Sequence, residues 1–567
     1  MKMSLFTGFA AAALAFSGPG EAVAAEEPTG QTTQAQTEAV GRLIEVWNFV
    51  KYHHPDAQAG RLAMDLEFFA LYPKMRDAGS TVQADAILAD WVTGLGPGNP
   101  CDPCAQSVEE SALALASPTP DWLRGLPAAL SQPLSAIYAN RRGHDGHFAV
   151  HPKRSTREAI LTNKADYSRA RPETDEALWA LALARAWGAL NYWFAYRDVM
   201  DESLETALPR AVMELFEAQN AADYQRAVLR FSAGADDGHV TIGQFYPAIM
   251  RPDAQCAIPY SLRYIEGQLV VDGRQMAGNG ALQAGDVLVS IDGQSTETMA
   301  DRVRPFIAAS NADALGRALM AEVRLGRCET LVVAILRGGT RQNLAVEWKP
   351  WPKHKIEAMT PHYQPGETIE TLPGGVTYVR YQQLKRADLD RLHALANAGS
   401  GLILDMRGYA SDNMLLQLGG MLVDEPIAYA RMARPVIDTP GAFFWDKPDS
   451  LRPRADGKRI TVPVVALIDH SAQSAPEYVT MGWRGAGVPI IGSRSAGADG
   501  NVTSITLPGG GVMRFSGLGV FYPDKSPTQR LGIIPDIEVR PTIAGVAAGR
   551  DEVLERAIAH LASMASE

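Results

Sequence analysis

A serine in a strand-to-helix turn is the residue of this chain best suited to chemistry. Ser474 lies in D-H-S-A-Q-S-A-P-E (469–477), after an apolar run and before a helical pattern. A hydroxyl at such a turn is accessible to a substrate, and the free N–H groups of a helix N-terminus can stabilise developing negative charge. Ser is also a common N-cap residue, so the local pattern alone leaves both roles open.

Further short motifs surround this serine in a fixed order. They are G-L-I-L-D-M-R-G at 401–408, S-A-P-E at 474–477, I-I-G-S at 490–493 and G-I-I-P-D-I at 532–537. In this order they resemble the tail-specific (C-terminal processing) protease family, including its tricorn-like and interphotoreceptor retinoid-binding-protein-like branches. The resemblance covers roughly residues 187–543. It implies a serine-type peptidase with Ser474 as nucleophile.

The same resemblance implies His239 as the general base. Many members of the family use a lysine in a G-K-G motif, but the matching stretch S-A-G-A-D-G (495–500) contains no lysine. The tricorn-like branch takes a histidine from an upstream D-x-H-type turn, and D-D-G-H-V (236–240) occupies that place. A positioned imidazole can accept a serine proton near neutral pH. The alternatives are a structural role for His239 and His470 as a weaker rival base.

The expected oxyanion site departs from the family pattern. The family motif D-L-R-x-N-x-G-G reads D-M-R-G-Y-A-S at 405–411, without the double glycine. We therefore expect the backbone N–H of Gly408 or Ala410, together with that of Ala475, to bind the oxyanion. The glutamate of the tricorn-like branch would fall near Gln529, and a glutamine can orient a histidine but cannot stabilise imidazolium as a carboxylate does.

The elements around these motifs predict an α/β core. Apolar runs at 376–380, 401–406 and 462–469 are typical of buried strands, and 476–484 and 551–564 are typical of helices. We place this core at 351–567. Within it, 428–459 is rich in Pro and Asp and predicts a loop near the site.

A region of short strands precedes the core. The turn L-Q-A-G-D-V-L (282–288), followed by a strand and I-D-G (291–293), resembles the PDZ family. The resemblance implies an inserted PDZ-like β domain at 251–350. PDZ folds bind extended peptides at a sheet edge. This copy either does the same or only packs against the catalytic core.

The remaining N-terminal part is predicted to be mainly helical. L-I-E-V-W-N-F-V-K-Y (43–52) is similar to L-A-R-A-W-G-A-L-N-Y (183–192), and apolar residues recur at helix spacing. The similarity indicates either a duplication or two similar amphipathic helix pairs. We expect a helical N-terminal region at 25–165 and a helical part of the catalytic unit, carrying His239, at 166–250.

The N-terminus and the cysteines indicate export. A basic Lys2, an apolar stretch and A-V-A at 22–24 predict a signal peptide at 1–24 and a periplasmic location, with an uncleaved anchor as the alternative. Four cysteines suit an oxidising compartment. The simplest pairing is Cys101 with Cys104 and Cys256 with Cys328, although C-D-P-C could also be half a zinc site or a redox pair.

Composition narrows the partners. The formal net charge of −11 provides no basic surface for nucleic acid or anionic lipid. No later run of about 20 apolar residues could span a membrane. The motifs imply no cofactor and no metal, so we expect a peptide or protein substrate. The alternatives are a weak or inactive relative that binds peptides, and an esterase-like hydrolase.

Overall fold

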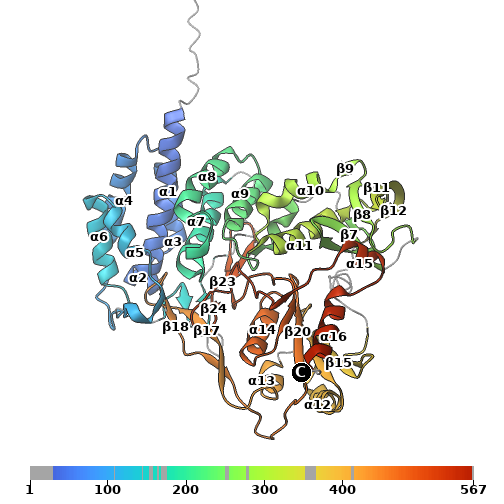
Figure 1. Ribbon diagram of the computed structural model, residues 1–567. Helices are drawn as coiled ribbons and strands as arrows, with labels where there is room; N and C mark the ends of the chain where they lie inside the picture. The colour runs from blue at the N-terminus through green and yellow to red at the C-terminus, as the bar shows by residue number, and fades with distance from the viewer. Residues whose placement is uncertain are drawn as a thin grey trace, which may run out of the picture.

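The structure is a computed structural model in which three regions are connected in chain order (Figure 1). A helical block lies beside a small sheet unit, and in this view both lie above a mixed α/β core. The described residues are 30–106, 109–143, 145–151, 157–162, 165, 167, 175–249, 255–275, 280–350, 366–409 and 414–564. The expected signal peptide at 1–24 lies outside them. Within these ranges no helix is both long and apolar enough to cross a membrane.

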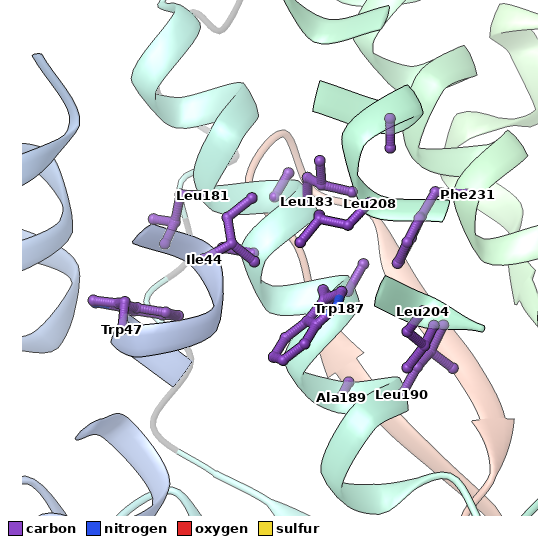
Figure 2. Close-up of a cluster of buried hydrophobic side chains, with 14 of the residues drawn as sticks. Ile44, Trp47, Leu181, Leu183, Trp187, Ala189, Leu190, Leu204, Leu208 and Phe231 are labelled. Carbon is purple, nitrogen blue, oxygen red and sulfur yellow. The ribbon is translucent and has the colours of Figure 1, made fainter. Parts of the chain in front are cut away.

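One hydrophobic core runs through the helical block. Its main helices are α1 (Gly30–His53), α3 (Met64–Arg76), α4 (Thr81–Leu95), α6 (Ala128–Ala139), α7 (Glu176–Trp193), α8 (Leu204–Glu217) and α9 (Ala221–Ala233). Figure 2 shows Ile44 and Trp47 of α1 near Leu181 and Trp187 of α7, together with Phe231 of α9. The prediction of a mainly helical N-terminal region is confirmed.

The two similar sequence segments lie in α1 and α7 and pack against each other. Asn48 Nδ2 donates to Ala184 O at 2.7 Å, and the rings of Tyr52 and Tyr192 lie 5.4 Å apart. A Cβ atom on Gly188 would lie 1.9 Å from Asn48 Oδ1, so glycine permits this close approach. Helix α7 is therefore a central, buried helix, and it leads directly to the residues around the candidate site.

The α/β core is built on a six-stranded sheet, and the predicted fold class is confirmed. Strands β15, β16, β20, β21 and β25 are parallel, and β14 pairs antiparallel with β15 at one edge. The bounds are β14 (Ile369–Thr371), β15 (Val376–Arg380), β16 (Gly401–Asp405), β20 (Val464–Ile468), β21 (Ile490–Gly492) and β25 (Ile537–Glu538). Three of these strands coincide with the apolar runs read as buried strands.

Helices cover both faces of this sheet. Helix α16 (Glu552–Met564) packs its apolar face on one side, where Leu561 contacts the core of the sheet. Helices α12 (Leu389–Ala398) and α14 (Ala475–Gly485) cover the other side. Because α14 begins directly after β20, its N-terminus lies at the carboxyl edge of the parallel strands, which is where ligands usually bind in such sheets.

The unit at 251–350 contains an antiparallel sheet in the order β12–β11–β8–β7–β6. Its strands are β6 (Tyr260–Ile265), β7 (Gln268–Gln275), β8 (Val287–Ile291), β11 (Thr330–Arg337) and β12 (Thr340–Glu347), with helices α10 (Thr296–Val303) and α11 (Ala312–Val323). Cys256 is joined to Cys328 by a disulfide, and Cys101 is joined to Cys104. The PDZ likeness of this unit remains a prediction.

The prediction of a loop at 428–459 is wrong in part, because three strands of a sheet lie almost entirely within this range. Strand β17 (Ile427–Pro435) pairs with β18 (Phe443–Trp445), β19 (Asp449–Leu451) and β24 (Gly519–Phe521). Strand β1 (Leu113–Leu115) of the N-terminal region pairs with β18. The Pro and Asp content of the segment favoured a loop, but strands distant in the sequence, β1 and β24, provide hydrogen-bonding partners that the local composition does not reveal.

Candidate active site

Ser474 has a backbone conformation that L-residues rarely adopt. It lies between β20 and α14 with φ 64° and ψ −125°. An ordinary N-cap residue is extended with negative φ, so Ser474 is not a typical helix cap. A non-glycine residue in this region costs roughly 1–3 kcal/mol, and such residues concentrate at functional sites. A serine on a sharp, strained strand-to-helix turn presents its hydroxyl outward, as the nucleophile does in α/β-hydrolases.

Glu477 holds this turn in place. Its fully buried carboxylate accepts hydrogen bonds from Ser474 N (3.0 Å) and Ala498 N (3.1 Å) through Oε2. Through Oε1 it accepts from Gly497 N (2.8 Å) and Ser495 Oγ (2.5 Å). Burial raises the pKa of Glu477, and these hydrogen bonds oppose the rise. The carboxylate therefore links the serine turn to the loop 495–498.

His239 is fixed by two polar neighbours. Its Nδ1 lies 2.9 Å from Ser516 Oγ and 3.8 Å from Asp237 Oδ1. The buried carboxylate of Asp237 also accepts from the backbone N–H groups of His239 (3.1 Å) and Ser516 (2.9 Å). A negative charge near Nδ1 favours the tautomer with the proton on Nδ1, which leaves Nε2 as the acceptor. Burial lowers the pKa of His239, and Asp237 opposes this shift.

The turns that carry His239 and Ser474 are in direct contact. Gln473 Nε2 donates to Gly238 O at 2.9 Å, so the residues preceding the two candidates are hydrogen-bonded to each other. A Cβ atom on Gly238 would lie 3.2 Å from the Cβ of Ala498, whose carbonyl accepts from Ser474 N at 2.8 Å. Residues far apart in the sequence are thus brought to one place at the carboxyl edge of the sheet.

The three backbone donors expected for the oxyanion are not equivalent. Ala475 N is at the first position of α14, and no acceptor for it is found among the described residues. The Gly408 prediction is not supported, because Gly408 N donates to Met406 O at 2.8 Å and is engaged in that turn. Ala410 lies in 410–413, outside the described residues. Ala475 is therefore the donor that the observed geometry leaves available.

Gln529 is near the site but contacts Asp237 rather than the imidazole. Its Nε2 donates to Asp237 Oδ1 at 3.3 Å, and its buried Oε1 has no hydrogen-bond partner within the described chain. Sequence reasoning missed Ser516 as the partner of His239. Asp237 was in the quoted D-D-G-H-V turn, but Ser516 ends strand β23 (Val512–Ser516) and carries no local signal.

The sheet unit also reaches the serine turn. The half-buried guanidinium of Arg317 on α11 donates to His470 O at 2.9 Å and to the side chain of Gln473. Burial lowers the pKa of Arg317 and Asp469 opposes the shift. The segment before Ser474 is thus held by an arginine from the 251–350 unit. In the part of the chain that the structure describes, no group of three or more His, Cys, Asp or Glu residues is arranged to hold a metal.

Comparison with known proteins relates the α/β core to a family of peptidases. Residues 375–539 match the family model described as peptidase family S41. Among solved structures, mature CPAF is similar with a TM-score of 0.52 at 15% identity, over 68% of this chain and 98% of that chain. A mutant of CPAF gives a TM-score of 0.54 at 14% identity, over 69% of this chain and 98% of that chain. No curated protein matches.

At these identities the likeness to CPAF concerns the fold alone. The match of 375–539 includes both β20 and α14, and therefore Ser474. Together with the ordered motifs, the match supports a peptidase of family S41, the tail-specific protease family, for the part of the chain at 375–539.

Proposed function

We propose that this chain is an exported serine peptidase in which Ser474 attacks a peptide carbonyl and His239 accepts its proton. The observation that carries the proposal is the positive-φ serine at the N-terminus of α14, in a turn that contacts the turn of a buried, oriented histidine. We further propose the division into a signal peptide (1–24), helical regions (25–165 and 166–250), a PDZ-like domain (251–350) and the catalytic core (351–567).

The histidine suits the role of base because its proton positions are constrained. Burial lowers the pKa of His239, so the imidazole is neutral near pH 7 and can accept a proton. With Nδ1 directed at Ser516 and Asp237, the free Nε2 is the accepting atom. Asp237 then stabilises the imidazolium formed when Ser474 attacks, in the way a carboxylate does in a serine–histidine–aspartate triad.

Negative charge on the tetrahedral intermediate would be bound by Ala475 N–H. The N-terminus of α14 adds its dipole to this donor. Serine peptidases usually use two donors, and Gly408 would have to leave Met406 O to become the second. This engaged Gly408 favours one alternative, a weakly active relative that binds peptides without efficient turnover.

Labelling with a fluorophosphonate probe tests the proposal. We expect covalent labelling of the folded wild-type protein and none of Ser474→Ala. Ser471→Ala is the matched control, because Ser471 lies three residues away and its hydroxyl donates to Asp469 Oδ1 at 2.6 Å. Labelling that survives in Ser474→Ala would refute Ser474 as nucleophile. Failure to label correctly folded wild-type protein would favour the peptide-binding alternative.

A further inference from the structure

Helix α11 of the antiparallel sheet unit contacts three segments of the candidate site. Just before the helix begins, the buried hydroxyl of Ser310 accepts from Gly238 N at 2.9 Å, in the histidine turn. Asn311 caps the helix through Oδ1, and its Nδ2 donates to Ser495 O at 2.9 Å and to Ala496 O at 3.0 Å. The start of α11 is therefore bonded both to the histidine turn and to the loop that supports the serine turn.

Arg317, farther along α11, holds the serine turn itself. Its guanidinium donates to His470 O at 2.9 Å and to Oε1 of Gln473, the residue before the proposed nucleophile. The neighbouring Gly316 packs so closely on Tyr264 of β6 that a Cβ atom there would lie 2.3 Å from the ring. Helix α11 is thus fixed against its own sheet, and the side chain of Arg317 extends from it to the core.

The hydrogen bond from Arg317 decides how the side-chain amide of Gln473 is turned. A guanidinium has donors only, so the oxygen of this amide must face Arg317. The amide nitrogen then points the other way, where it donates to Gly238 O at 2.9 Å. Gln473 and Gly238 are the residues directly before Ser474 and His239. Their hydrogen bond therefore joins the turn of the nucleophile to the turn of the base, and Arg317 sets its direction.

We propose that Arg317 is a positioning residue for the proposed reaction. By directing the Gln473 amide at the histidine turn, it keeps Ser474 and His239 at the separation that proton transfer requires. The inference rests on the proposed function, and it gives the sheet unit a part in catalysis that involves no contact with the substrate. A base must lie within hydrogen-bond reach of the proton it takes, and a misplacement of about 1 Å can cost about 100-fold in rate.

Gln473→Glu separates this role from a purely structural one. Its carboxylate still accepts from Arg317, and this stronger, charge-assisted bond offsets the lost one, so the urea unfolding midpoint should stay near that of the wild type. The second oxygen would face Gly238 O, and two acceptors repel each other. We expect fluorophosphonate labelling of Ser474 to slow about 10- to 100-fold. For an activated ester, kcat should fall likewise while KM stays within about 2-fold.

Substitutions of Arg317 form the second arm of the experiment. Arg317→Met removes every donor, so the Gln473 amide is free to turn and labelling should slow about 10-fold. Arg317→Lys keeps one donating group and should restore part of the rate. Arg302→Met is the matched control, because it removes an exposed arginine of α10 in the same unit, and it should label at the wild-type rate.

Two results would overturn the inference. The first is labelling at the wild-type rate in folded Gln473→Glu. The second is a raised KM with unchanged kcat, which would place the effect in substrate binding. If Arg317→Met does not fold, Gln473→Glu decides alone, because it retains the partner of Arg317. A folded wild-type protein that stays unlabelled would instead refute the proposed function.

Discussion

Replacing Glu477 by glutamine should disable the serine turn while leaving the size of the side chain unchanged. The carboxylate accepts from Ser474 N, Ala498 N, Gly497 N and Ser495 Oγ. In the less costly orientation, the amide nitrogen of glutamine would take the place of Oε1. Ser495 Oγ can accept from that nitrogen, but Gly497 N–H would face another N–H group.

The structure sets the magnitude of this effect. One buried N–H without an acceptor costs roughly 1–3 kcal/mol. The positive-φ conformation of Ser474 stores roughly the same amount. The loss of hydrogen bonding is therefore comparable to the strain, so the turn should relax in a large fraction of molecules. At 1.36 kcal/mol per tenfold change, we expect labelling of Ser474 to slow about 10-fold.

Two measurements check this prediction for Glu477→Gln. Urea unfolding should show a free energy of unfolding lower by about 1–3 kcal/mol. Fluorophosphonate labelling should slow under conditions where the variant remains folded. Glu425→Gln, an exposed glutamate, should change neither quantity. Wild-type stability together with wild-type labelling in Glu477→Gln would refute the role of this carboxylate.

Three further predictions concern the base and the disulfide. Asp237→Asn should lower kcat by about 10²–10⁴, because imidazolium loses its counter-charge, and an unchanged kcat would contradict this. Burial lowers the pKa of His239, so the rate of labelling should rise with pH through a pKa below 6.5, and a labelling profile centred well above 7 would exclude this base. The contribution of His239 to stability is present above its unfolded pKa and should be lost as pH falls. Cys328→Ser removes the disulfide to Cys256, which joins residues separated by 72 positions in the sequence. The free energy of unfolding, measured by urea titration without reductant, should fall by about 4 kcal/mol. An unchanged unfolding midpoint would contradict this prediction.

The core of the fold could be predicted because its signals are local. The strands of the parallel sheet are continuous apolar runs, as sheets buried on both faces require, and β15 spans the residues expected from the sequence, 376–380. The turn at Ser474 was evident from a strand, a serine and Pro476 in succession. Strand β17 was missed because its stability comes from β18, β19 and β24, which the local composition does not reveal.

The surroundings of the candidate site were harder to predict for the same reason. Ser516 contacts His239 only because β23 pairs with β4 (Thr241–Ile242), just after the histidine. Gly408 was expected to donate to the oxyanion, but its N–H closes a turn on Met406 that spacing alone cannot show.

The most direct test of the account is the turnover of one activated ester or peptide by Ser474→Ala, His239→Ala and the double variant. Groups that act as one unit are not additive, so each single change should remove nearly the whole rate, on the order of 10³-fold or more, and the double change little further. Multiplicative losses in the double variant would contradict a Ser474–His239 unit. Full activity in His239→Ala with none in His470→Ala would show that the base is His470.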